Sequence, residues 1–201
     1  AIAGLKKVSE GSIFLNGKEI TTETIRKRIE EGISYIPEDR QDVGLVLDFT
    51  LENNLVLKTY RNSRFSRKGN PKAIRENGEQ LIQKYDIRSG QGAKTIVRSM
   101  SGGNQQKAII GREIELNSSL MIFVQPTRGL DIGAIENIHK QIIRERDNGK
   151  AVLLISLELD EIMNCADTIG VIYNGEMQNI AEAKSLTTNQ VGEFMMGVKH
   201  A

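Results

Sequence analysis

The chain has 201 residues, of which 39% are hydrophobic and 26% are charged, a composition typical of a globular protein with one sizeable core. These proportions exclude a wholly disordered chain, and the formal net charge of +1 gives no reason to expect binding to nucleic acid or to a membrane surface. The single cysteine, Cys165, excludes an internal disulfide, fits a reducing compartment, and has apolar neighbours that favour a packed thiol. The longest apolar runs, 120–124 and 151–157, are far shorter than the ~20 residues that span a bilayer.

The first forty residues predict a hairpin, a helix and a strand. In chain order these elements are expected over residues 12–15, 18–21, 22–31 and 33–36. The two short strands flank Asn16-Gly17, the dipeptide most typical of a tight hairpin turn, and Pro37 stops the last strand. Residues 1–7 have the pattern of a helix end that closes near Gly4.

The stretch from Gln41 to Met100 contains no convincing core strand and is expected to form a helical insert. A polar loop is expected over residues 38–42, and helices are expected over 51–59 and 72–85. The segment that joins these helices interleaves aromatic and basic side chains, a pattern that could bind single-stranded nucleic acid. A solvated loop is the favoured interpretation of this segment.

The second half of the chain alternates helices with short apolar strands. Helices are expected over 104–116, 135–146, 158–164 and 187–196, with strands between them over 121–124, 152–156, 168–173 and 176–180. Ile135, Ile138 and Ile142 fall on one stripe of their helix. This alternation predicts an α/β fold in which helices cover the faces of a parallel sheet.

The strongest chemical signal is the run Ser101-Gly102-Gly103-Asn104-Gln105-Gln106 at the start of a predicted helix. Backbone N–H groups and the positive end of the helix dipole face outward there, which favours an anion. The two glycines permit close approach of a phosphate, and Ser101 could both cap the helix and bond a phosphate oxygen. Taken alone, the run is better interpreted as an ordinary Ser-Gly-Gly turn followed by an N-cap.

A second run, LMIFVQPTRGLD over residues 120–131, follows about twenty residues later. In order and separation, the two runs resemble the signature motif, Walker B strand and D-loop of ATP-binding cassette (ABC) ATPases. Residues 33–40 resemble the Q-loop segment of that family, and residues 152–161 resemble its switch-loop segment. The resemblance implies an ABC-type P-loop NTPase core, with a parallel sheet, flanking helices and a peripheral antiparallel sheet, plus a helical subdomain.

The same resemblance implies a single nucleotide-binding domain over residues 1–201. Its parts would be peripheral strands and the Q-loop region over 1–40, a helical subdomain over 41–103, and the α/β core with a C-terminal helix over 104–201. The motifs PEDR, QPTRGLD and SLELDE resemble the C-terminal cassette of two-cassette importers for simple sugars and nucleosides. Residues 48–57 most resemble the nucleoside, guanosine-type branch.

Several groups that ATP hydrolysis needs in this family are absent from the sequence. The GxxxxGK[ST] loop that wraps phosphates occurs nowhere in it, and the family pattern places this Walker A loop just before Ala1, so we expect a truncated fragment. Val124, Gln125 and Leu157 stand where the family has the Walker B carboxylate, the catalytic glutamate and the switch histidine. Neither aliphatic side chain binds Mg²⁺, and an amide accepts no proton.

Glu38 stands at the Q-loop glutamine position, where it would add negative charge near phosphate. The chain's own half-site is therefore expected to be weak or inactive, with no metal ligands assigned. His139 and His200 have no metal-ligand company and receive no chemical role.

The signature motif is intact, and in this family it acts in trans on ATP held by a partner cassette. The resemblance implies that Ser101, Gly102, Gly103, Asn104 and Gln105 complete the partner's ATP site, and that the D-loop residue Asp131 lies at the interface. The implied cofactors are ATP and Mg²⁺ in the full cassette pair.

The implied function is that of the ATPase component of an importer for simple sugars or nucleosides. The partners would be the N-terminal nucleotide-binding domain of the same chain, two membrane permease subunits and an extracellular solute-binding protein, with the protein peripheral to the cytoplasmic face of the plasma membrane. Two alternatives are a non-transport ABC ATPase acting on nucleic acid or the ribosome, and a regulatory module that binds ATP without hydrolysing it. Long heptad repeats, a zinc insertion or a strongly basic face would favour the first alternative, and the sequence has none of them.

Overall fold

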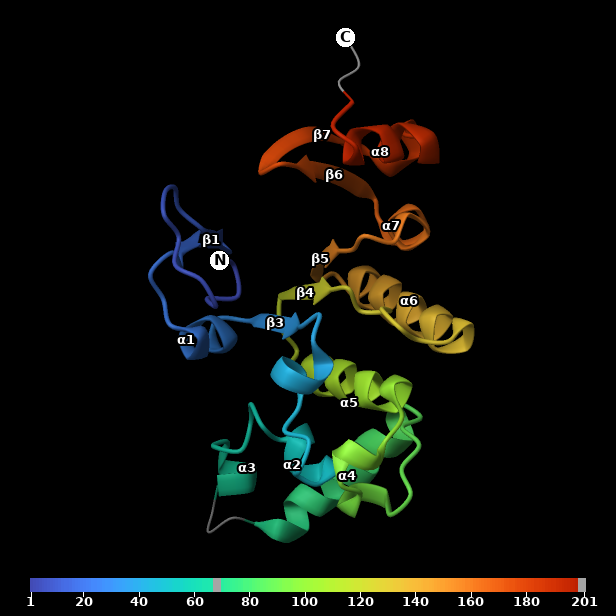
Figure 1. Cartoon of the computed structure of the whole chain (residues 1–201). Coiled ribbons are helices and arrows are strands. Elements are labelled where there is room, and N and C mark those ends of the chain that lie inside the picture. The colour runs from blue at the N-terminus through green and yellow to red at the C-terminus, as the bar shows by residue number, and fades with distance from the viewer. Residues whose placement is uncertain (67–69, 199–201) are drawn as a thin grey trace.

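The computed structural model describes residues 1–66 and 70–198 (Figure 1). Three parallel strands lie at its centre in the order β3 (Ile33–Ile36), β4 (Leu120–Val124) and β5 (Ala151–Ile155). Their register pairs Ile36 with Phe123 and Val124 with Ile155, so the carboxyl ends of all three strands lie at one edge. The parallel sheet expected from the sequence is confirmed.

Two helices cover one face of this sheet: α5 (Gly102–Ile114) and α6 (Ile132–Asp147). The fully buried residues between the sheet and these helices include Ile36, Met121, Phe123, Ile109, Ile110, Ile138 and Ile142. Burying each such side chain contributes about 1.5–3 kcal/mol, so this layer is the main source of stability. The α5 helix begins two residues earlier than expected, so the expected division after residue 103 falls within its first turn.

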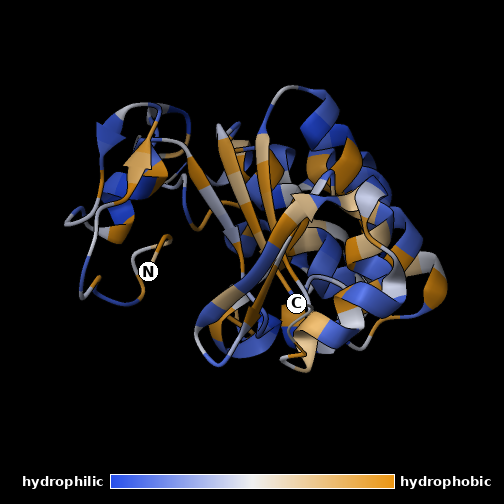
Figure 2. Cartoon of the chain, turned by 90° about the horizontal axis from the view of Figure 1, so that it is seen from above, coloured by the Kyte–Doolittle hydropathy of each residue, from blue (hydrophilic) through white to orange (hydrophobic). Residues whose placement is uncertain are grey.

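The opposite face of the sheet is covered more thinly. Its buried residues are Ile33 and Ile122, and Leu153 is only partly buried. The covering side chains come from the first twenty residues and include Ile2, Ala3, Ile13, Leu15 and Ile20. Within the described residues, β5 pairs with β4 alone, and Ile155 at its end is 48% exposed. Figure 2 shows the apolar central strands from above, with the N-terminal segment beside them.

The helical insert expected between residues 41 and 100 is confirmed. It contains α2 (Leu51–Leu55), α3 (Ser63–Ser66) and α4 (Pro71–Lys84), which lie together beyond α5 at the bottom of Figure 1. Two short 3₁₀ helices, η2 (Gly92–Lys94) and η3 (Val97–Ser99), lead back to the start of α5.

Two expectations for this insert were wrong. The polar loop over residues 38–42 is largely a π-helix, η1 (Arg40–Gly44), because Asp39 accepts hydrogen bonds from the amides of Gln41 (2.9 Å) and Asp42 (2.8 Å) and so starts a turn. These two bonds hold the pKa of the Asp39 carboxyl below its usual value. The α2 helix ends at Leu55 instead of continuing to Thr59.

Hairpins and short helices complete the two ends of the chain. In chain order they are β1 (Phe14–Leu15), β2 (Lys18–Glu19), α1 (Ile25–Glu30), α7 (Leu159–Cys165), β6 (Thr168–Tyr173), β7 (Glu176–Glu182), η4 (Ala183–Ser185) and α8 (Thr188–Met195). Both strand pairs are antiparallel, and each turns at an Asn-Gly dipeptide with positive φ, as expected. Residues 1–7 form turns and bends, with Gly4 bonded back to Ala1, so the helix end expected there was wrong. Within residues 1–66 and 70–198, no helix has both the length and the apolar character to cross a bilayer.

The α5 helix approaches its neighbours closely at two glycines. An ideal Cβ on Gly44 would lie 2.6 Å from Ile109 Cδ1, and one on Gly111 would lie 2.8 Å from Cδ2 of the Tyr85 ring. Contacts shorter than 3 Å force the neighbour to move, and the Tyr85 ring is buried between α4 and α5. Both glycines therefore set the distance at which the helical insert packs on α5.

We expect Gly111→Ala to lower the free energy of unfolding by about 1–3 kcal/mol, because the methyl group overpacks against the Tyr85 ring. Gly192→Ala is the matched control, since an added Cβ meets nothing within 4 Å on α8, and alanine should raise the free energy of unfolding by about 0.5–1 kcal/mol. Urea unfolding of both variants measures the difference. Equal effects at the two positions would contradict the close packing of α4 on α5.

Cys165 is buried at the end of α7, as the sequence indicated, and burial together with the charge of Glu161 raises the pKa of its thiol to about 11. At pH 8 this leaves about 100-fold less thiolate than an ordinary cysteine has. We therefore expect iodoacetamide to alkylate Cys165 at least about 100-fold more slowly in the folded chain than in urea. Equal rates before and after unfolding would contradict the packed environment.

Candidate nucleotide-binding site

The parallel register brings three of the expected site residues to one edge of the sheet. Glu38 follows β3, Gln125 follows β4 and Leu157 follows β5, within two residues of the strand ends. Val124 is the last residue of β4 and is half-buried. The carboxyl edge of a parallel sheet is where α/β proteins bind ligands. These four positions therefore belong to one site.

Gln125 has a strained backbone conformation. Its φ of 49° lies in the left-handed region, which costs an ordinary residue about 1–2 kcal/mol. Two backbone hydrogen bonds hold this conformation. The backbone N–H of Gln125 donates to Ile155 O (2.8 Å), and the backbone carbonyl of Gln125 accepts from the backbone N–H of Arg128 (3.2 Å). Left-handed residues of this kind cluster at functional positions, where the surrounding structure fixes them.

The donor set at this edge does not fit Mg²⁺. This ion requires oxygen ligands, which the hydrocarbon side chains of Val124 and Leu157 lack, and the Leu157 side chain is largely exposed (74%). Within the described residues, no three His, Cys, Asp or Glu side chains come close enough together to hold a metal ion. No catalytic step can be assigned to a metal held by this edge.

Glu38 lies in an ion pair that the sequence did not indicate. The Arg128 guanidinium donates to Glu38 Oε1, and Arg40 Nη2 donates to the backbone carbonyl of Arg128 (3.0 Å). The negative charge expected near phosphate is therefore compensated by Arg128. Both contacts join residues about ninety positions apart in the chain, a separation that sequence pattern alone does not signal.

The signature run forms the first turn of α5. Ser101 is the N-cap residue, but its side chain makes no capping bond to the described residues and instead accepts from Asn104 Nδ2 (2.8 Å). The capping role expected for the Ser101 hydroxyl was therefore wrong, because the Asn104 amide engages it. Ser101 is exposed and the next three residues are half-buried. The first amides of a helix have no partner within the helix, so this turn keeps N–H groups available to an anion.

The two glutamines that follow are part of the interior. Gln105 is 1% exposed and donates through Nε2 to Val97 O (3.0 Å), so its side chain points away from solvent. Gln106 is 2% exposed and donates through Nε2 to Pro126 O (2.8 Å). The Gln106 bond attaches the signature helix to the loop after β4. The position of Gln106 in the signature run does not indicate this role.

Asp131 begins α6 and lies in the same region as the signature run. Its side chain accepts from the amide of Ala134 (2.9 Å), which makes it a helix N-cap. An ideal Cβ on Gly103 would lie 3.8 Å from Ala134 Cβ, so the first turns of α5 and α6 are in contact. The loop 126–131 and the signature turn therefore form one surface.

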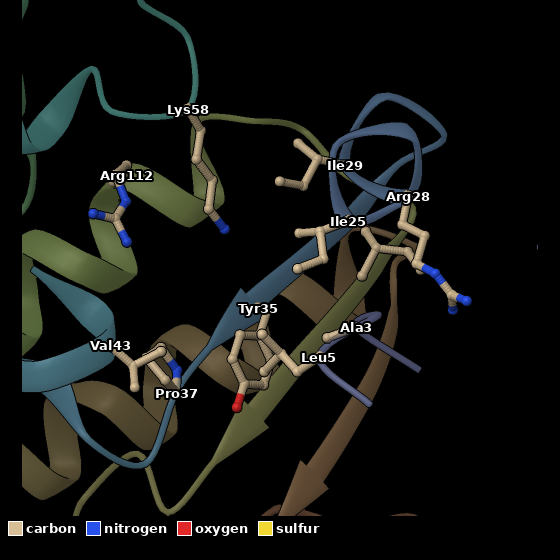
Figure 3. Close-up of a pocket in the computed structure, with 11 residues that line it drawn as sticks. Ala3, Leu5, Ile25, Arg28, Ile29, Tyr35, Pro37, Val43, Lys58 and Arg112 are labelled. Carbon is tan, nitrogen blue, oxygen red and sulfur yellow. The ribbon is translucent and has the colours of Figure 1, made fainter. Parts of the chain in front are cut away.

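A separate cavity of about 180 Å³ lies on the thinly covered face of the sheet (Figure 3). It is lined mainly by apolar side chains, and the Lys58 amine points into it. Burial lowers the pKa of Lys58, although its ion pair with buried Glu113 (2.6 Å) acts in the opposite direction. None of the expected site residues lines this cavity, although Pro37, which directly precedes Glu38, does.

Of the two histidines with no expected chemical role, the structure describes only His139. His139 Nε2 lies 3.2 Å from Oε1 of Glu161, a contact between α6 and α7. His200 lies outside the described residues, as do Arg67 and Lys68 of the basic segment.

Known ATP-binding proteins of ABC transporters are similar to this chain. The family model described as ABC transporter matches residues 1–128. A nucleoside import ATP-binding protein of Lactococcus lactis subsp. cremoris is 48% identical over 98% of this chain, and a guanosine import ATP-binding protein of Bacillus subtilis is 47% identical over 98%. The chain spans about two fifths (39%) of the length of each of these relatives.

Solved structures give the same fold. A nucleotide-free ATP-binding cassette from an ABC transporter superimposes with a TM-score of 0.75, covering 95% of this chain and 77% of that one at 20% identity. At this level of identity the similarity supports the fold and not the function. The family match over residues 1–128, more than half of the chain, identifies it as a member of the ABC transporter family.

Proposed function

We propose that this chain is the second nucleotide-binding domain of an ABC import ATPase that takes up nucleosides or simple sugars. The support is its similarity, at 48% and 47% identity, to proteins named as nucleoside and guanosine import ATP-binding proteins, and at 33% to one named for ribose import in Lactococcus lactis subsp. lactis. The partners would be an N-terminal nucleotide-binding domain of the same chain, two permease subunits and an extracellular solute-binding protein. The protein would act at the cytoplasmic face of the plasma membrane.

The single observation that carries the mechanism is a contrast between two parts of the site. The strand edge presents Val124, Gln125 and Leu157, which supply neither a metal ligand nor a general base. The first turn of α5 keeps both glycines and an exposed start. We infer that this domain does not hydrolyse ATP in its own half-site and that its signature turn completes the site of the partner domain.

In that arrangement the chain would help to position ATP held by the partner and would stabilise negative charge on its terminal phosphate. Backbone N–H groups of Gly102 and Gly103 would donate to the terminal phosphate of ATP held by the partner, where charge develops during phosphoryl transfer. The partner would supply the Mg²⁺ ligands and the residue that orients the attacking water. Asp131, which starts α6 beside the signature turn, would face the opposite site.

The thin face of the sheet fits the proposed layout. Ile155 ends a strand that, in the described structure, has a neighbour on one side only, and the cavity beside Tyr35 and Lys58 adjoins the first residues of the chain. We propose that the strand and helix that carry the phosphate-binding loop in longer relatives cover this face in the assembled protein. The open strand edge and the incomplete apolar layer support this proposal.

The proposed mechanism predicts opposite outcomes for two substitutions in the full-length protein within the assembled transporter. Gly102→Asp should abolish steady-state ATP hydrolysis, because a carboxylate would occupy the path of the terminal phosphate. Gln125→Ala should keep most of the activity, because the neutral amide is no general base. Gly90→Asp, at an exposed glycine where an added Cβ meets nothing within 4 Å, is the charge-matched control.

The reverse pattern, with Gly102→Asp tolerated and Gln125→Ala damaging, would mean that this domain hydrolyses ATP in its own half-site. Loss of activity in the Gly90→Asp control would instead indicate a general effect of added negative charge.

Asp131 offers a test that separates capping from an interface role. Asp131→Ala should lower the free energy of unfolding by about 1 kcal/mol, whereas Asp131→Ser, which can still cap, should change it by less than about 0.5 kcal/mol. If Asp131 also positions the opposite site, Asp131→Ser should lower ATP turnover despite its normal stability. Wild-type turnover in Asp131→Ser would reduce the role of Asp131 to capping α6.

A further inference from the structure

We propose that Glu38 and Arg40 form a clamp on Arg128 that holds the loop 126–131 in register with the signature turn. The inference rests on the proposed function, in which this surface acts on ATP held by the partner domain. It assigns a positioning role to two arginines that the motif comparison left without one. It also gives Glu38 a role other than replacing the Q-loop glutamine.

The clamp engages Arg128 at two points. The Arg128 guanidinium binds the Glu38 carboxylate, and the Arg128 backbone carbonyl accepts a hydrogen bond from Arg40 Nη2 at 3.0 Å. Because side chain and backbone are held separately, the peptide after Arg128 cannot rotate without breaking one contact. That peptide leads into Gly129, whose φ of 69° turns the chain toward Asp131.

Arg40 also lies directly against both functional loops. An ideal Cβ on Gly129 would lie 3.4 Å from Arg40 Nη2, and one on Gly102 would lie 3.6 Å from Arg40 Cζ. The guanidinium therefore fits between the two glycines, with the signature turn on one side and the loop 126–131 on the other. Gln106 bonds Pro126 O from the interior, so the loop is held from two directions.

The charges favour a positioning role over a contribution to folding. Arg128 and Glu38 are 67% and 48% exposed, and solvent screens ion pairs at this exposure. Within the described residues, Arg40 has no carboxylate at ion-pair distance, and its guanidinium donates to the backbone carbonyl of Arg128. Removing the clamp should therefore leave the fold intact and change the geometry of the loop.

The test is a double-mutant cycle in the full-length protein within the assembled transporter, read as steady-state ATP hydrolysis. Glu38→Ala and Arg128→Ala should each lower kcat about 5- to 10-fold with KM for ATP within about 2-fold of wild type, and the double variant should lose no more than either single variant. The exchanged pair, Glu38→Arg with Arg128→Glu, should restore most of the lost kcat. Arg40→Lys should retain more activity than Arg40→Ala, because lysine keeps a donor for the Arg128 carbonyl.

Arg26→Ala is the matched control, because Arg26 is a similarly exposed arginine in an ion pair with Glu30 on α1, away from this surface. Its kcat should equal that of wild type. Urea unfolding of every variant checks that stability is unchanged.

The proposal is overturned if the Glu38 and Arg128 effects multiply independently, or if the exchanged pair stays as impaired as the single variants. Gly103→Asp on the same preparations keeps the two hypotheses apart, because a Cβ on residue 103 would face Ala134 and not Arg40. Full activity in Gly103→Asp refutes the trans mechanism, while the cycle still decides whether Glu38 and Arg128 are coupled. Loss of activity in Gly103→Asp together with independent effects refutes the clamp alone.

Discussion

The parallel pairing of β3, β4 and β5 is the constraint on which the rest of the structure depends. Parallel strands require crossover connections, so each strand here ends at the same edge and is followed by a loop or helix start. Glu38, Gln125 and Leu157 lie at one edge of the sheet for this reason, although almost ninety residues separate the first two. Side chains along each strand point alternately to the two faces of the sheet, so the core has two parts. The α5 and α6 helices pack on one face, and only the first part of the chain packs on the other.

A buried charge cluster on α5 joins the helical insert to the parallel sheet. Glu113 is fully buried and binds Lys58 (2.6 Å), Arg112 Nε (3.0 Å) and the amide of Tyr35 (3.3 Å). A buried carboxylate is tolerated only when such partners satisfy it, so the segment just after α2, α5 and β3 are held in one arrangement. Arg112 extends the cluster to the carbonyl of Gly44 (3.0 Å), where the π-helix ends. The start of α5, which carries the signature turn, is thereby fixed relative to the segment that carries Glu38 and Arg40.

Local sequence signals were sufficient for most elements but not for the contacts that define the site. The Asn-Gly turns and apolar strands are specified by neighbouring residues, so they were predictable. Residues 1–7 and the segment after Pro37 differ from the expectation because side-chain bonds decide the backbone geometry there. Arg28 donates to the carbonyls of Ala1 and Ile2, and Asp39 accepts from the amides that follow it. The order of motifs predicts that Gln125 and Asp131 belong to the site. It could not show that Arg40 reaches the carbonyl of Arg128, since nothing along the chain encodes that distance.

The structure also separates the side chains at the strand edge from the contacts that maintain the fold. Leu157 is largely exposed at a strand end, so a leucine there is compatible with the fold although it takes no part in the core packing. Gln106 is different, because its buried amide satisfies the Pro126 carbonyl, and an apolar replacement would leave that carbonyl unpaired at a cost of about 1–3 kcal/mol. Side chains at the open edge are thus separable from the interior contacts that shape the signature surface. Under the proposed function, a domain that does not hydrolyse ATP in its own half-site would therefore keep the geometry that its partner needs.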